Sequence, residues 1–455
     1  MSVETELAAL GQRLLDPAAP PLERFAAMED DDSDVRVFVA ARHDAVSGVL
    51  CEEPVFSLRH YDELLEQVLP GTRYLVGEDD AARQVRLHQL HAAQNWLDAQ
   101  RNAPAAGEPP NMAIGFRDWI GAMAREEADA ILDVLQRRAS TGEPVNFARE
   151  YAFLIAYRMA RRFIGVPAPE TVPGLVRMIV MWRNTLRPGQ SLRLKDELGD
   201  SVAMLVMLQP LFGHVFGTVV NSPSALQALT RRTATPALEA IDQALAAPQS
   251  APEHSLLSAL VAVRPQFAGV ADYDLQARSV LFELIGALVL IVGKSLSEIA
   301  AFTSSPAGVA AGITWDDLVA RMADRRVTLK DHDATVNEML RLAVSSRLTR
   351  TVRNDCQWRG VDLKAGDRVV VLMDPASRDP AAFAEPGRFK PDPARPYITS
   401  GPLQGPHVCY GRGIAWTIMR EAIAATQGRI APAQDTTIAV FAGLPDDLPF
   451  VACRP

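Results

Sequence analysis

Residues 405–412, GPHVCYGR, decide the fold predicted for this chain. Gly405 and Gly411 flank Cys409, and glycines let the backbone pass close to a flat or bulky group. A helical pattern over residues 413–422 follows at once, so the Cys409 sulfur is expected at a helix N-terminus. Exposed N–H groups and the helix dipole favour a thiolate at such a position.

A thiolate in this setting is a suitable ligand for haem iron, with His407 and nearby arginines available for the carboxylates of the haem. The alternative is a buried structural thiol, because free cysteine is among the most buried residue types. The order of features upstream of Cys409 favours the first interpretation.

These upstream features begin with Glu338 and Arg341, three residues apart on one face of a helix expected from about Asp333. A strand-like segment follows at 350–355. A hairpin pattern comes next, with strands at 361–363 and 368–372 around a turn at 364–367. A segment rich in proline and phenylalanine, 377–391, then leads to Cys409.

This ordered series resembles the cytochrome P-450 family of haem-thiolate enzymes, closely over 333–424 and more loosely elsewhere. The length of 455 residues alone would favour two or more domains. The resemblance implies instead one large domain over 1–455, mainly α with small β-sheets, that binds haem b.

The resemblance assigns roles to individual residues. Cys409 would be the iron ligand, and His407 and Arg350 would bind the haem propionates. Arg86, on a helix expected over 79–101, would also bind a propionate, with Arg83 as the alternative. Arginine suits this role because its planar fork binds carboxylates in a bidentate manner. The alternative is that Arg83 and Arg86 simply lie on a solvent-exposed basic face of their helix.

The resemblance also implies a structural triad of Glu338, Arg341 and Arg388 that supports the loop on the haem side and is not catalytic. One departure lies just before the cysteine motif. The family has Phe-Gly where this chain has Pro402-Leu403, so the aromatic ring that normally packs beside the sulfur is missing.

A long helix expected over 272–302 would cross the distal face of the haem. Family monooxygenases carry an acid and a threonine there, which deliver protons during dioxygen activation. The preferred register places the small pair at Ile285-Gly286, the acid position at Leu288 and the threonine position at Val289. The residues above the iron would be Gly286, Ala287, Leu288, Val289 and Leu290, and Gly286 and Ala287 would leave room there.

A later register uses Gly293 as the small residue, with Ser295 and Leu296 at the acid and threonine positions. Neither register restores both groups. The catalytic residue therefore stays unassigned, with Glu283, Ser295 and Ser297 as the candidates for proton delivery.

Two helices expected at 171–186 and 194–220 occupy the lid region of the family, and 56–74 is expected to be a loop. Apolar side chains on these helices are candidates for lining a substrate channel, with core packing as the alternative: Met178, Met181, Trp182, Met204, Met207 and Phe212.

The composition excludes several classes of protein. A net charge of −9 argues against nucleic acid and anionic membranes as partners. The four cysteines have neither zinc spacing nor a disulfide pattern, which fits a reducing compartment. The N-terminus has no signal or anchor, and the apolar run 284–293 is too short to span a bilayer. We expect a cytoplasmic protein without a membrane anchor.

The sequence therefore predicts a soluble, bacterial-type haem-thiolate monooxygenase of secondary metabolism. It would insert oxygen into an apolar small molecule, or couple it oxidatively, with electrons from a separate ferredoxin and reductase. Two alternatives stay open. One is an enzyme that uses peroxide or acts on a lipid hydroperoxide as isomerase or lyase, because the distal acid and threonine are missing. The other is a non-catalytic haem sensor.

Overall fold

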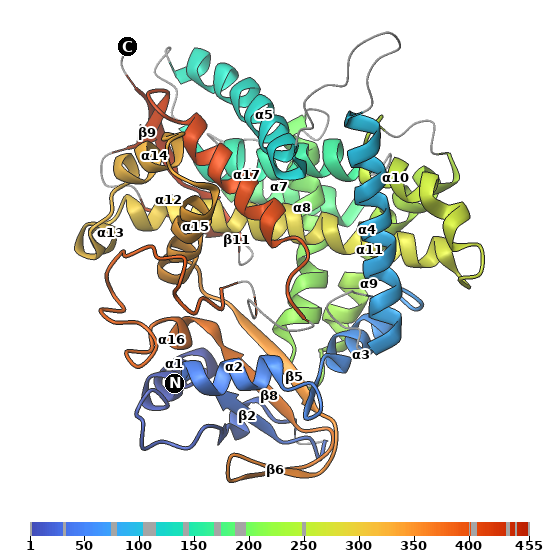
Figure 1. Cartoon of the computed structure of the whole chain (residues 1–455), viewed down its shortest axis with the longest axis vertical. Coiled ribbons are helices and arrows are strands. Elements are labelled where there is room, and N and C mark those ends of the chain that lie inside the picture. Colours follow the sequence, from blue (N-terminus) through green and yellow to red (C-terminus); the bar gives the residue numbers. More distant parts are fainter. Residues whose placement is uncertain are drawn as a thin grey trace.

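One continuous apolar helix organises the computed structural model of the chain (Figure 1). It is made of α11 (Tyr273–Gly286), a π-helical segment η7 (Ala287–Val292) and α12 (Gly293–Thr303). Most of its side chains are buried, which its nearly uninterrupted apolar sequence requires. The π segment packs against α6, α8 and α17, so it lies where several helices meet.

The structure describes residues 2–30, 33–73, 80–102, 115–139, 145–167, 174–186, 197–247, 252–399, 401, 407–433, 437–441 and 444–453. The N-terminal helices are α1 (Val3–Arg13), η1 (Ala26–Met28), α2 (His43–Cys51), α3 (Arg59–Val68), α4 (Asp80–Asn102) and α5 (Phe116–Ala139). The next helical segments are η2 (Phe147–Phe153), α6 (Leu154–Met159), η3 (Ala160–Ile164), α7 (Gly174–Leu186), α8 (Glu197–Gly217), α9 (Ser224–Ala246), α10 (Leu256–Val263) and η6 (Arg264–Phe267). After the central helix come α13 (Pro306–Ala311), α14 (Trp315–Ala323), α15 (Leu329–Ala343), α16 (Met373–Ser377) and α17 (Arg412–Ala425).

A five-stranded sheet lies at one end of the molecule, in the order β1-β2-β8-β5-β3 (Figure 1). Its strands are β1 (Glu23–Arg24), β2 (Val37–Ala40), β3 (Phe56–Ser57), β5 (Arg347–Val352) and β8 (Arg368–Leu372). Only the pair β2–β8 is parallel. The smaller sheets are built from β4 (Val145–Asn146), β9 (Ile430–Pro432) and β12 (Pro449–Ala452), from β10 (Ala439–Phe441) and β11 (Leu444–Asp447), and from β6 (Cys356–Trp358) and β7 (Val361–Leu363). The predicted mainly helical fold with small sheets is confirmed.

Two local predictions need correction. Residues 361–363 do not pair with 368–372: β7 pairs with β6, while β8 joins the large sheet beside β5 and β2. The turn between them exists, with Asp367 N–H donating to the Lys364 carbonyl at 3.1 Å, but it connects two different sheets. Within 56–74 the chain also forms β3 and α3, although a loop was expected there.

Two buried histidines attach α3 to the C-terminal end of α8. His60 Nε2 lies 2.8 Å from the Thr218 carbonyl, and His214 Nε2 lies 2.7 Å from the Leu64 carbonyl. A carbonyl accepts only from a protonated ring nitrogen, so each Nε2 is the donor. Burial lowers the pKa of both rings, that of His60 to about 3, so both stay neutral near pH 7. Each crosslink is therefore a neutral hydrogen bond in the interior.

Two candidate channel residues on α8, Met204 and Met207, are 4% and 1% exposed and belong to the core. Met178 and Met181, on α7, face solvent with 59% and 67% exposure. The Trp182 side chain lies outside the described residues.

Two helical stretches, Glu197–Gly217 and Tyr273–Thr303, are long and apolar enough to cross a membrane. Most of each stretch is buried inside the protein, as in the core helices of soluble proteins.

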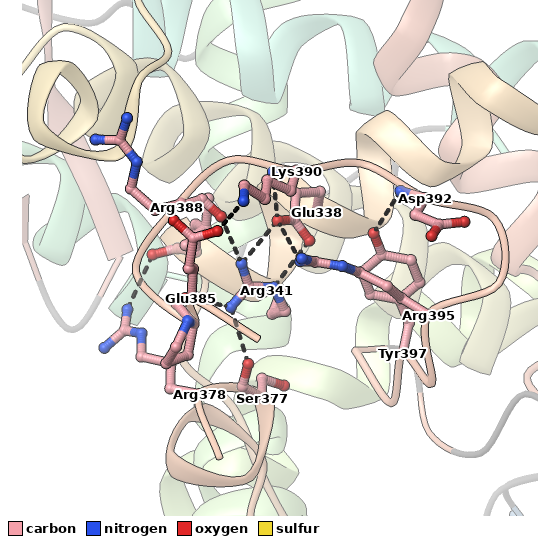
Figure 2. Close-up of polar contacts among 12 residues, drawn as sticks. Glu338, Arg341, Ser377, Arg378, Glu385, Arg388, Lys390, Asp392, Arg395 and Tyr397 are labelled. Carbon is pink, nitrogen blue, oxygen red and sulfur yellow. Dashed lines mark hydrogen bonds and ion pairs between the residues drawn. The ribbon is translucent and has the colours of Figure 1, made fainter. Parts of the chain in front are cut away.

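A fully buried ion pair connects α15 to the segment that follows α16 (Figure 2). Arg341 donates from Nε and one Nη to the two carboxylate oxygens of Glu338, at 2.8 and 2.7 Å. Its other donors bind three backbone carbonyls, at 2.6 to 3.1 Å, those of Ser377, Pro386 and Arg388. The pair therefore fixes the path of a long irregular segment.

The second arginine of this network is Arg395, whereas Arg388 was predicted. Arg395 donates to Glu338 Oε1 at 3.0 Å, as Figure 2 shows. Arg388 contributes its backbone carbonyl to Arg341, and its guanidinium donates at 2.7 Å to the Ala310 carbonyl in α13. The chain turns between the two positions, so that Arg395 and not Arg388 points at the carboxylate.

We predict that Arg395→Ala destabilises the protein more than Arg388→Ala. Removing one member of a buried charge network leaves the others unpaired and costs roughly 3–5 kcal/mol, whereas Arg388 donates to a carbonyl at an exposed position. Urea denaturation of the two variants measures the difference. Glu338→Ala, which leaves two arginines unpaired, should give little folded protein. Equal free energies of unfolding for the two arginine variants would contradict this assignment.

Candidate haem-binding site

Cys409 lies three residues before Arg412, the first residue of α17, so it is near a helix N-terminus as the sequence predicts. Its side chain is exposed, yet enough protein surrounds it that desolvation raises the pKa of the thiol. Backbone N–H groups of Gly411 and Arg412 donate to the sulfur and oppose that shift. The thiol is therefore placed to lose its proton when a metal cation binds it, because coordination deprotonates a thiol.

His407 lies two residues earlier, and its side chain is only 6% exposed. Burial, followed by the charges of Arg83, Arg350 and Arg353, lowers the pKa of His407 to about 3. Its Nε2 atom lies 2.6 Å from a carboxylate oxygen of Glu53. The ring is therefore neutral near pH 7 and lies within a cluster of positive charge.

Three elements far apart in the sequence supply this cationic cluster, which we define as Arg83, Arg350, Arg353, His407 and Glu53. Arg83 comes from α4, Arg350 from β5, and Arg353 follows directly after β5. Arg83 and Arg350 are 5% and 3% exposed. Arg353 donates from Nε to the Glu53 carbonyl at 2.7 Å, which fixes Glu53 beside it.

Among these groups, three guanidinium charges against one carboxylate leave two positive charges, and His407 is neutral. Haem b carries two propionates, so the donor set matches its charge and supplies the bidentate forks that carboxylates prefer. The residues present therefore fit the cofactor that the sequence predicts.

The two arginines considered on α4 have different surroundings. Arg83 is close enough to His407 for its charge to lower the pKa of that ring. Arg86 donates to the Arg73 carbonyl at 3.1 Å. Arg353 and Glu53 were not predicted. The proximity of Arg353 to Arg350 in the sequence was a possible signal, whereas Glu53 gave none.

The exposed residues of the central helix coincide only in part with those expected above the iron. Glu283, Ala287 and Ile291 keep partial or full exposure, and Ile291 is 52% exposed. Leu288, Val289 and Leu290 are buried, and Val289 is 0% exposed. The charge of Glu283 raises the pKa of Cys409, so this part of the helix lies within electrostatic reach of the sulfur. The η7 segment also packs against α17, which follows Cys409.

Gly286 and Gly293 are the glycines that served to align the central helix with the family motif. Each of them leaves room for a phenylalanine ring from another helix. A Cβ on Gly286 would lie 2.7 Å from the Phe212 ring, and one on Gly293 would lie 2.2 Å from the Phe153 ring. The space beside Gly286 is thus filled by a ring from α8, and only Ala287 remains partly open.

Ser295 and Ser297, the serine candidates for proton delivery, are 2% and 0% exposed. Ser297 donates to the Gly293 carbonyl of its own helix at 2.8 Å. Glu283 is therefore the candidate that retains both exposure and an interaction with Cys409. Gly405 and the Pro402-Leu403 pair lie outside the described residues.

Comparisons with known proteins point to one family. The sequence model of the cytochrome P-450 family matches residues 321–426. Protein AknT of Streptomyces galilaeus is 27% identical over 388 residues, covering 81% of this chain and 72% of that protein. The 20-oxo-5-O-mycaminosyltylactone 23-monooxygenase of Streptomyces fradiae is 35% identical over 104 residues, covering 22% of this chain and 24% of the enzyme. The chain thus spans between a quarter and about a third of the length of several curated relatives that it matches.

Solved structures match over nearly the whole chain. Cytochrome P-450 BioI, in complex with hexadec-9Z-enoic acid ligated acyl carrier protein, has a TM-score of 0.66 at 13% identity and covers 99% of both chains. CalO2 has a TM-score of 0.65 at 18% identity, covering 99% of this chain and 96% of the other. The motif around Cys409, the family match over 321–426 and the whole-chain fold together support a bacterial cytochrome P-450.

Proposed function

We propose that the chain is a haem-thiolate monooxygenase that binds haem b through Cys409 and oxidises a small apolar molecule. The observation that carries this proposal is the pairing of the Cys409 thiol at the start of α17 with a cationic cluster of two net positive charges. A fold match alone does not specify chemistry, so the proposal depends on these residues.

Each residue has a defined part in this scheme. Cys409 would hold the iron, and the N–H groups of Gly411 and Arg412 would stabilise its thiolate. Arg350 and His407, with Arg83, would hold the propionates, while Arg353 and Glu53 would keep that cluster in place. When bound, haem supplies the electron transfer and oxygen chemistry that amino-acid side chains lack. The protein excludes water and positions the substrate.

Proton delivery on the distal side would depend on Glu283. No side chain of the π segment, Ala287–Val292, carries a hydroxyl or a titrating group. Glu283 lies one turn earlier on the accessible side of the same helix. A carboxyl group there can pass protons through ordered water to the distal side of the haem.

The same apolar segment supports a second function. An enzyme that uses peroxide or a lipid hydroperoxide starts with an O–O bond already made and needs fewer delivered protons. That enzyme would need no ferredoxin or reductase, whereas the monooxygenase would take electrons from both. A sensor without turnover is the third possibility. For each function we propose one domain, a cytoplasmic location and a place in secondary metabolism.

The first prediction for this site is that Cys409→Ser abolishes the long-wavelength Soret band of the reduced carbon monoxide complex. That band reports a thiolate ligand, and a serine hydroxyl does not give it. Cys51→Ser is the control, because Cys51 is another exposed cysteine, and it should keep the band. Persistence of the band in Cys409→Ser would show that another group binds the iron.

The second prediction is that Arg83→Ala loses haem faster than Arg86→Ala. A charge-assisted hydrogen bond contributes about 1.5–3 kcal/mol, which corresponds to roughly a tenfold or larger change in haem retention. Arg350→Ala and His407→Ala should resemble Arg83→Ala. Transfer of haem to apomyoglobin measures the rates, and the carbon monoxide spectrum confirms unchanged thiolate ligation. Faster loss from Arg86→Ala than from Arg83→Ala would favour Arg86, the first choice from the sequence.

The third prediction is that Glu283→Gln uncouples dioxygen-driven turnover. General acid–base catalysis typically contributes about 10²–10⁴-fold, so product formed per reduced nicotinamide consumed should fall while peroxide release rises. Peroxide-driven turnover should change little. Val289→Thr, which is nearly isosteric, should improve coupling if the preferred register holds.

Glu298→Gln is the matched control, since Glu298 is on the same helix but pairs with Lys294 at 2.7 Å. Unchanged coupling in Glu283→Gln would assign proton delivery to the substrate or to another group. Peroxide-driven turnover without any dioxygen-driven turnover would favour the second function, and no turnover with either oxidant would favour the sensor.

A further inference from the structure

The contact between Phe212 and Gly286 joins the lid helix α8 directly to the central helix. A Cβ placed on Gly286 would lie 2.7 Å from Phe212 Cε2 and 3.3 Å from Cζ. Real side chains do not approach to 2.7 Å, so the ring rests on the bare backbone at this position. Only glycine at 286 allows the ring to be there without displacement.

The Phe212 ring is held in this position by an aromatic row, which we define as Phe212, Phe216 and Tyr61. The centroids of successive rings in the row are 5.1 Å apart, a favourable spacing for tilted aromatic pairs. The Tyr61 hydroxyl accepts a hydrogen bond from the Thr349 N–H at 2.7 Å, which attaches the row to β5.

The backbone that carries the row is also fixed. His214 and His60 tie the end of α8 to α3 through the Leu64 and Thr218 carbonyls. Phe212 is therefore supported by its neighbouring ring and by crosslinks on both sides of Phe216. Its position over Gly286 is part of the packed structure.

The row lies between the two halves of the candidate site. At one end, Phe212 contacts the turn that separates Glu283, within electrostatic reach of Cys409, from the partly exposed Ala287. At the other end, Tyr61 interacts with Arg350 of the cationic cluster. Phe212 and Phe216 are only partly buried, so part of each ring remains available for contact.

We propose that Phe212 determines the size of the substrate group that reaches the distal side of the haem, and that Phe212 and Phe216, the partly exposed rings of the row, form the wall against which a flat apolar group packs. This inference rests on the proposed haem-binding function. Apolar groups that fit beside the ring would be accepted, and bulky ones would clash with it because Gly286 leaves the ring no room to retreat.

Imidazole and 4-phenylimidazole test this proposal, because both bind haem iron through a ring nitrogen and differ by one phenyl group. Spectral titration of the haem-loaded full chain gives both dissociation constants. In Phe212→Ala the affinity for 4-phenylimidazole, relative to imidazole, should rise by roughly tenfold or more, the effect of about 1.4 kcal/mol. Phe212→Leu should give a smaller rise and guards against poor folding of the alanine variant. Phe116→Ala, which removes another half-buried ring, is the control and should leave the ratio unchanged.

Gly286→Ala provides an independent arm through a double-mutant cycle. Alone, it should displace Phe212 and lower both thermal stability and haem loading. In the double variant with Phe212→Ala, thermal stability and haem loading should recover, because the clashing ring is gone.

The outcomes are distinguishable. An unchanged affinity ratio in Phe212→Ala and Phe212→Leu, with normal imidazole binding, overturns the role of Phe212 and leaves the haem site standing. A Gly286→Ala defect that Phe212→Ala does not relieve also overturns it. Absence of any imidazole spectrum in wild type contradicts the proposed function, and this inference with it.

Discussion

The buried pair Glu338–Arg341 is the interaction on which the rest of the structure depends. Both side chains are 0% exposed, and two charges without water are tolerated only when their hydrogen bonds are satisfied. Arg341 meets this requirement by binding three carbonyls, and Glu338 by accepting from Arg395 and the Lys390 N–H. Satisfying the pair thus specifies the path of residues 377–395, a stretch whose own sequence forms little regular structure after α16.

The candidate haem site, in contrast to this ion pair, brings several charges of the same sign close together. In the cationic cluster, three buried or half-buried arginines face one carboxylate, so the positive charges are only partly compensated by these neighbours. Like charges brought together repel each other and are favourable only if an anion joins them. In the proposed function, the two propionates of haem b would supply the negative charge that Glu53 alone does not.

The sequence predicted those features that depend on local patterns. Helix α4 lies within one residue of the predicted bounds at each end. The order of motifs identified Glu338, Arg341 and Cys409, because each lies at a set distance from a helix end. The sequence does not decide between Arg86 and its alternative Arg83, since two arginines on one helix face cannot be distinguished by spacing alone.

Features that depend on contacts between segments far apart in the sequence were not predicted. Arg395 replaces Arg388 because the irregular chain turns between them, and no periodic pattern encodes that turn. β7 pairs with β6 because β8 is needed between β2 and β5 of the large sheet. Glu53 lies beside His407 although 354 positions separate them in the sequence, and nothing near Glu53 indicates this contact.

The central helix shows how such a tertiary contact changes the interpretation of a motif. Its small residue Gly286 was expected to leave room over the iron, but the Phe212 ring fills that space. The adjoining π segment rotates the helix, since each π turn contains an extra residue, and π segments often occur at functional sites. The rotation agrees with the exposure of Ala287 and Ile291 and with the burial of Val289. A count along an ideal helix does not take this rotation into account, and in the proposed function Glu283 is the acid on the accessible side of the helix, before the π segment.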